Sequence, residues 1–375
     1  MHPDNTPRLT SVNHEIGIAD MYAVQHQFSS NVVPRRQWNA NWGYCGETSY
    51  ICAGLSFGQY CSQYTARALA SPGVNQSEQK SQLLPGVNDL TAASAMQLRR
   101  HEFDSKASAA EFMAWAKMHL LEGHVPIIGV FNNVFALGEK TYQGDARQRQ
   151  KDRWKGDPQF DHIVPVLGFA SDWPLVKDAG HYRYHASDVI TFSDNGLYGK
   201  VGDPEHYPFL FSYNVTTFQG TRFQANDPRK FPIYMLPNKP PYYGVAIEGV
   251  RDKDNVTIPV SLSCDQNDEP EMMNGSNTPP TPVPIQLTAT LNLPDQSVAY
   301  NLYRYDDFAN VPGKDFNLAA AASTVAYHIP AGSDPITVDP PSADTVVRSG
   351  STVVVTHQTT SDQTVVFRAV PASAS

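Results

Sequence analysis

The stretch Gln37-Trp-Asn-Ala-Asn-Trp-Gly-Tyr-Cys45-Gly-Glu-Thr-Ser49 places a cysteine beside a glycine at the entry to an expected helix. From Thr48 to Leu69 apolar residues recur at close to the helical period, although Gly54 and Gly58 weaken that helix. The first N–H groups and the dipole of a helix stabilise a thiolate, so a cysteine at this position is a candidate nucleophile. The alternative interpretation is that Cys45 is a small buried hydrophobic residue.

Further along the chain, one helix and three strands are expected. Ser108, with Glu111 three residues later, forms a capping-box signature for a helix from about 108 to 121, which Gly123 would end. Short apolar, β-branched runs at 124–131, 162–169 and 188–194 indicate strands, and the charged stretch between the first two indicates a long surface loop, 138–160. The pattern predicts an α+β domain.

Two of these strands carry polar residues that a thiol nucleophile needs. His162 opens the second strand, and Asp194-Asn195 ends the third. A thiolate hydrolase uses a base beside the sulfur and a third group that orients the imidazole, and folding brings these together from distant segments.

This order of Cys, His and Asp or Asn resembles the papain-like cysteine peptidase superfamily, in particular the branch of bacteriocin-leader (double-glycine) peptidases. The run GYCGETS is also similar to the start of the catalytic helix in phytochelatin synthase, another member. The resemblance, which spans about residues 37–200, implies that Cys45 is the nucleophile, His162 the general base and Asp194 the orienting group. Asn195 is the alternative orienting residue.

The resemblance also implies a side-chain amide that stabilises the oxyanion. The family usually has Gln six residues before the cysteine, whereas this chain has Asn39, with Gln37 and Asn41 on either side. An Asn amide can donate the same hydrogen bond.

Composition changes between about Gly249 and Pro284. The segment 265–284, rich in Asn, Pro and Thr, is expected to be a linker. Short alternating segments from 285 to 375 predict an all-β sandwich. The predicted organisation is an N-terminal lead-in (1–36), a papain-like catalytic domain (37–264), the linker and an accessory β-sandwich domain.

Charge and hydropathy narrow the range of partners. A net charge of −9 over 375 residues argues against a nucleic-acid partner, because such a partner needs a dense cationic surface. No apolar run approaches the ~20 residues needed for membrane insertion. The expected partner is a peptide or protein substrate. Sequons at Asn75, Asn214, Asn255 and Asn274 hint at secretion, although the opening residues are too polar for a signal peptide.

No cofactor is expected, and the remaining Cys and His residues suggest little further chemistry. His181 and His185 are spaced for a metal site on a helix, but the aromatic alternation around them favours a strand without further ligands. Cys52 and Cys61 are expected on one helix, too far apart to pair with each other, and either could pair with Cys264. Glu47 is expected to interact with the helix dipole.

The sequence therefore favours a cysteine peptidase or amidase that forms a thioester intermediate. An acyl or γ-glutamyl transferase of the same fold would differ only in the acceptor that resolves the thioester. A catalytically silent binding protein is the third hypothesis, because the usual Gln is absent.

Overall fold

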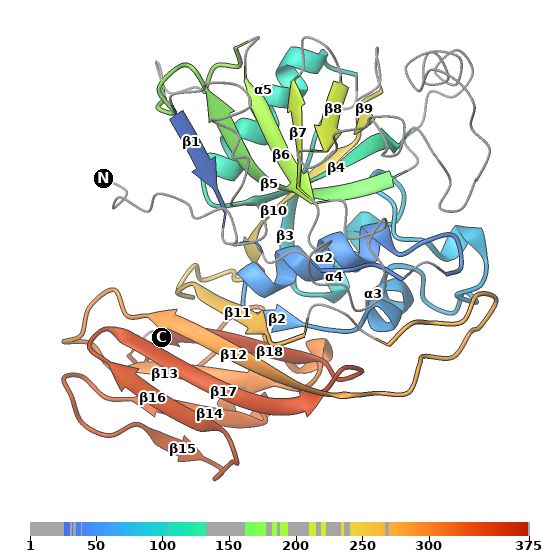
Figure 1. The fold of residues 1–375 in the computed structure, drawn as a ribbon. Coiled ribbons are helices and arrows are strands. Elements are labelled where there is room, and N and C mark those ends of the chain that lie inside the picture. The colour runs from blue at the N-terminus through green and yellow to red at the C-terminus, as the bar shows by residue number, and fades with distance from the viewer. Residues whose placement is uncertain are drawn as a thin grey trace. The chain divides into compact units, whose positions relative to one another are not determined.

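The computed structural model describes most of the chain and divides it into two compact units (Figure 1). The described residues are 26–30, 32, 35–38, 40–104, 106–132, 162–177, 182–185, 188–193, 210–214, 219–222, 234–235, 241–266 and 270–373. Unit 1 comprises Met1–Gln37, Leu84–Val87 and Arg100–Glu248, and unit 2 comprises Trp38–Leu83, Asn88–Arg99 and Gly249–Ser375.

Unit 1 is built around an antiparallel sheet with the order β3-β10-β4-β5-β6-β7-β8, to which β1 adds on β5 and β9 on β4. The strands are β1 (His26–Ser29), β3 (Leu98–Glu102), β4 (Val125–Asn132), β5 (His162–Ser171), β6 (Val189–Ser193), β7 (Leu210–Asn214), β8 (Gln219–Arg222), β9 (Tyr234–Met235) and β10 (Gly244–Val250). The three strands predicted in this region are confirmed as β4, β5 and β6. β1 was not predicted, because it lies within the expected lead-in.

Helix α5 (Ala109–Leu121) packs on β4 and β5 (Figure 1). Its predicted capping box is present: Ser108 Oγ accepts from the Glu111 N–H, and the Glu111 carboxylate accepts from the Ser108 N–H. Gly123 follows the helix with a φ of +84° and ends it as predicted. The core beneath α5 is aromatic and aliphatic, and includes Phe112, Trp115 and Phe192.

Unit 2 combines helices from early in the chain with the C-terminal strands. Its helices are α2 (Cys45–Ser56), α3 (Gln63–Ala70) and α4 (Asp89–Ala95). The single helix expected from Thr48 to Leu69 is interrupted, because Gly58 adopts a φ of +73° and leads into β2 (Gln59–Tyr60). Cys52 and Cys61 consequently lie on either side of this break, and both are buried.

The C-terminal part of unit 2 is all β, with two antiparallel sheets. One has the order β11-β12-β17-β16 and the other β15-β14-β13-β18-β2. The strands are β11 (Val260–Cys264), β12 (Pro284–Asn292), β13 (Tyr300–Tyr305), β14 (Val325–Ile329), β15 (Thr337–Asp339), β16 (Thr345–Ser349), β17 (Thr352–Thr360) and β18 (Val365–Pro371). The alternating runs identified in the sequence are confirmed as strands, and β11, β15 and β16 join them.

Helix α2 belongs to the same unit as these sheets because β2 extends one of them. β2 pairs with β18, so that Tyr60 lies opposite Val365. The buried guanidinium of Arg368 donates to the Phe57 carbonyl and to the Gln59 side chain. These compact units therefore divide the chain differently from the predicted domains at 37–264 and 285–375.

The segment expected to be a linker packs against the region before Cys45. Met272 is 4% exposed and joins a small core with Trp38, Ala40 and Tyr44. The low apolar content of 265–284 pointed to a free connector, but one buried methionine and a set of hydrogen bonds hold part of it in place. No helix among the described residues has the length and hydropathy needed to cross a membrane.

Candidate functional site

The predicted nucleophile occupies the first position of a helix. Helix α2 begins at Cys45. Tyr44 is its N-cap residue, and the Tyr44 side chain makes no capping hydrogen bond to the helix. The Cys45 residue is buried, with 8% of its surface exposed. The first N–H groups of a helix have no acceptor within the helix, so this end can stabilise negative charge. The expectation that Cys45 opens a helix is confirmed.

The loop before Cys45 turns through three consecutive residues with positive φ: Asn41 (47°), Trp42 (72°) and Gly43 (85°). Arg67 of α3 holds this turn by donating hydrogen bonds to the carbonyls of Asn41 and Gly43. Its guanidinium also stacks on the Tyr44 ring, 3.5 Å from the ring centroid.

Glu47 completes this scaffold. Its carboxylate lies 2.6 Å from Nε of Arg67, and both side chains are almost fully buried. The same carboxylate accepts a hydrogen bond from the Leu83 backbone. Glu47 lies in the first turn of α2, the position that the helix-dipole interpretation requires, and it is in addition the ion-pair partner of Arg67.

Of the three candidate oxyanion donors, the structure constrains two. The Asn41 amide donates to the Ser276 carbonyl, and its oxygen accepts from the Gly275 N–H. Asn41 therefore holds the 272–276 segment. Gln37 is 4% exposed, and among the described residues its Oε1 has no hydrogen-bond partner. Asn39 lies outside the described residues.

The predicted base and orienting group belong to unit 1. His162 is the first residue of β5, lies opposite Val130 of β4 and is 2% exposed. Strand β6 ends at Ser193, and Asp194 and Asn195 lie outside the described residues. Cys45 belongs to unit 2. The approach of Cys45 to His162 therefore stays a prediction.

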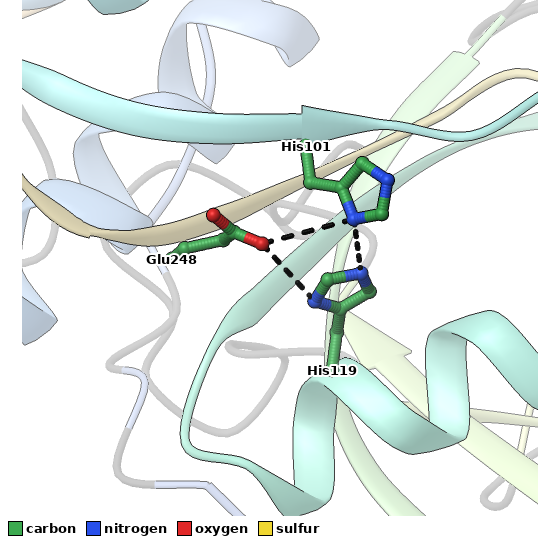
Figure 2. Close-up of side chains that lie close together, drawn as sticks. All are labelled: His101, His119 and Glu248. Atoms are coloured by element: carbon green, nitrogen blue, oxygen red, sulfur yellow. Dashed lines mark hydrogen bonds and ion pairs between the residues drawn. The ribbon is translucent and has the colours of Figure 1, made fainter. Parts of the chain in front are cut away.

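A second group of reactive side chains gathers in unit 1, where His101 of β3, His119 of α5 and Glu248 of β10 point toward one another (Figure 2). Nδ1 of His101 lies 3.0 Å from Nε2 of His119 and 3.7 Å from Oε1 of Glu248. Nδ1 of His119 lies 4.0 Å from the same carboxylate oxygen. Each residue offers one potential ligand atom, and these three atoms lie within 4.8 Å of one another.

His119 is the buried member of this group, and a third imidazole, that of His124, contacts it. Its Nδ1 lies 2.9 Å from Nδ1 of His124, just beyond the end of α5. Burial, together with the neighbouring His124 and His101, lowers the pKa of His119 to about 4. His119 is therefore neutral near pH 7, the form in which an imidazole donates a lone pair.

The His181–His185 pair does not form a strand in its described part. His181 lies outside the described residues, and residues 182–185 have no regular secondary structure. The His185 ring stacks on Trp173 with centroids 4.8 Å apart, and its backbone N–H donates to Asp188. Within the described ranges, the group that could hold a metal is His101, His119 and Glu248.

The sequence analysis missed this histidine group because its members come from three separate elements. The local signal was His119 and His124 flanking the end of a predicted helix, which by itself indicates nothing about His101 or Glu248. Comparisons with protein-family models, with curated proteins and with solved structures gave no match.

Proposed function

We propose that this protein is a cysteine-nucleophile hydrolase with a papain-like catalytic fold, which cleaves a peptide or peptide-like amide bond. The observation that carries the proposal is the position of Cys45 as the first residue of α2, after a turn fixed by a buried ion pair. A free-standing loop would not need such a scaffold. A nucleophile does, because its attack requires a fixed geometry.

The proposed reaction has two acyl-transfer steps. The Cys45 thiolate attacks the amide carbon and forms a tetrahedral oxyanion, which collapses to a thioester as the amine leaves with a proton from His162. His162 then removes a proton from water, and the resulting hydroxide attacks the thioester carbon. Breaking the carbon–sulfur bond releases the acid and restores Cys45.

Asp194 is the proposed orienting residue, with Asn195 as the alternative. Either side chain could fix the tautomer of the imidazole. A carboxylate also stabilises the imidazolium, which an amide does not do.

The oxyanion donor is proposed to be Asn39 or Gln37. Asn41 is a weaker candidate than the sequence indicated, because its amide already donates to Ser276. Trp42 is 65% exposed in the same loop and offers an aromatic surface for a peptide substrate.

The C-terminal sheets are proposed to form an accessory β-sandwich. Secretion of the protein stays a proposal, and it is based on the four sequons.

Alkylation by iodoacetamide at neutral pH, followed by peptide mapping, tests the nucleophile. Cys264 is more exposed than Cys45, so accessibility alone would make Cys264 react first. We expect Cys45 to react at least about tenfold faster than Cys264, because only Cys45 has a helix terminus and a proposed base to stabilise its thiolate. Slower labelling of Cys45 than of Cys264 in the folded protein would contradict the assignment of Cys45 as the nucleophile.

Hydrolysis and transfer are separated by a second measurement on an amide substrate that the enzyme cleaves. Added glycine or another amine acceptor should leave the yield of free acid almost unchanged in a hydrolase. A transferase would convert the acyl group into the amide of the acceptor, and a silent binding protein would show neither product.

A further inference from the structure

The group of His101, His119 and Glu248 has the composition of a transition-metal site. Imidazole nitrogens and a carboxylate oxygen are ligands that Zn²⁺ prefers, and two His with one Glu leave a fourth position for water. We propose that this group binds one divalent transition-metal ion, best matched by Zn²⁺, through Nδ1 of His101, a ring nitrogen of His119 and a carboxylate oxygen of Glu248.

The distances fit an ion at the centre of the group. Zn–N and Zn–O bonds of about 2.0 to 2.1 Å in a tetrahedral site separate neighbouring ligand atoms by about 3.3 Å. The nitrogens of His101 and His119 are 3.0 Å apart, and His101 lies 3.7 Å from Glu248. Movements of a few tenths of an ångström bring these two pairs to coordination distance. The His119–Glu248 pair, within 4.8 Å, closes by a larger movement of the Glu248 side chain, which is 27% exposed.

The hydrogen positions on the imidazoles also leave lone pairs for a metal. A neutral imidazole carries one donor and one acceptor nitrogen. If Nδ1 of His119 donates to His124, its Nε2 accepts from Nδ1–H of His101 in the metal-free protein. Metal binding then moves the His101 proton to its Nε2, which frees the Nδ1 lone pair. His124 then has the role that outer-shell partners have in known metal sites, which is to fix the tautomer and ring orientation of a ligand.

Access and charge support the same interpretation. The His119 side chain, on α5, is 2% exposed, whereas the His101 side chain is 52% exposed and that of Glu248 is 27% exposed. A metal can therefore enter from solvent and keep a water ligand there. The Glu248 carboxylate offsets part of the charge of a dication that two neutral histidines would leave uncompensated.

The test is a titration of the full chain with ZnCl₂ by isothermal titration calorimetry, after removal of bound metal with a chelator and removal of the chelator. It is performed on the wild type and on a Cys45→Ala background, because a thiolate also binds zinc. His328→Ala is the matched control, since His328 is an exposed histidine of β14 far from the group in sequence.

We expect one equivalent of Zn²⁺ to bind the wild type, the Cys45→Ala protein and the His328→Ala protein with similar affinity. His101→Ala should weaken binding at least 100-fold through loss of a ligand. Glu248→Gln should weaken it 10- to 100-fold, and His124→Ala should do so by a similar factor if His124 orients His119. Bound metal should also raise the midpoint of thermal unfolding.

The proposal is overturned if the wild type binds no stoichiometric Zn²⁺, or if binding persists unchanged in both His101→Ala and Glu248→Gln. Loss of binding in the Cys45→Ala background alone would also overturn it, because the ion would then sit on the thiol. Both substituted side chains are partly exposed, and far-UV circular dichroism of each metal-free variant establishes that it is folded.

Discussion

The loop before Cys45 and the group around His119 both contain buried polar side chains, but these side chains have different partners. Around the loop, Arg67 of α3 and Asn41 donate to backbone carbonyls, and Glu47 of α2 accepts from a backbone N–H. In the histidine group, the ring nitrogens face one another and a carboxylate oxygen. The first arrangement fixes the course of the chain, whereas the second brings potential ligand atoms of three side chains within 4.8 Å of one another.

This difference in partners distinguishes side chains that stabilise the fold from side chains that could bind a ligand. A side chain that satisfies backbone groups is costly to remove, because its removal leaves those groups unsatisfied. Removal of a half-exposed side chain such as His101, whose ring nitrogen faces other side chains, leaves no backbone group unsatisfied, so this residue contributes less to folding. Substitutions in the two regions should therefore divide into effects on stability and effects on metal binding.

Arg67→Met should have the largest effect on stability. The substitution keeps the apolar stem but leaves the Glu47 carboxylate buried without its cation and removes the donor to the loop carbonyls. We expect a loss of about 3 to 5 kcal/mol in the free energy of unfolding, measured by urea denaturation.

Lys80→Ala is the matched control for Arg67→Met. Lys80 forms an ion pair with Glu78 in the same unit, but both side chains are largely exposed. The expected loss is at most about 0.5 kcal/mol. Equal losses for the two variants would mean that the buried pair is not a scaffold.

A second cluster of buried polar side chains surrounds Asp344, and the pH dependence of the free energy of unfolding tests its contribution. Burial alone would raise the pKa of Asp344, but hydrogen bonds from His357 and Tyr327, together with the nearby charge of Arg304, lower it to about 2. A lowered pKa stabilises the fold above the unfolded value near pH 4, and this stability is lost as the pH falls toward 2.

We expect the Asp344 carboxylate to contribute about 2 kcal/mol at pH 6. Asp344→Asn should lose this contribution at pH 6, and the gap between variant and wild type should narrow at pH 3. Urea denaturation at several pH values measures both. A gap that stays constant with pH would show that the effect comes from packing and not from the charge.

Asn41→Ala should give an intermediate effect. It removes the hydrogen bonds to Gly275 and Ser276 and places alanine at a positive φ. Asn255→Ala is the control, because Asn255 is exposed and also has a positive φ, 54°. We expect Asn41→Ala to cost about 1 kcal/mol more than the control.

Limited proteolysis gives the second readout for Asn41. The 272–276 segment should resist cleavage in the wild type and in Asn255→Ala, and should be cut faster in Asn41→Ala. Rapid cleavage of the wild type at 272–276 would restore the original interpretation of this segment as a free linker.

His101→Ala in the metal-free protein should have the smallest effect on stability. Its side chain is half exposed, so we expect a change within about 0.5 kcal/mol by urea denaturation. A loss as large as that of Arg67→Met would place His101 among the scaffold residues and weaken the distinction between the two regions.

Much of the local structure was predictable because its signals are local. The capping box of Ser108 and Glu111 and the Gly123 stop fixed the limits of α5, and β-branched runs identified β4, β5 and β6. Gly58 was a recognised weak point of the expected helix, but the packing that breaks the helix there was not predictable from local sequence. A Cβ at Gly58 would lie 3.1 Å from the Phe367 carbonyl and from Val260. Those contacts come from β18 and β11, which are remote in sequence.

The candidate site also contains residues whose role was predictable from local sequence and residues whose role was not. Cys45 was predictable because its position at a helix start follows from neighbouring residues. The roles of Asn41 and Glu47 were not, since their partners Gly275 and Arg67 become neighbours only after folding. The grouping of His101, His119 and Glu248 depends on the packing of α5 against a sheet, which no local pattern encodes.

The rate of Cys45 alkylation in the wild type and in His162→Ala, measured across pH 5 to 9, tests the central claim most directly. The account predicts that the wild type reacts rapidly below pH 7, and that His162→Ala slows this reaction at least about tenfold. His328→Ala should leave it unchanged, and continued slow labelling of Cys52 and Cys61 reports that each protein stays folded. Equal Cys45 rates and pH profiles in the wild type and in folded His162→Ala would contradict the proposed Cys45–His162 pair.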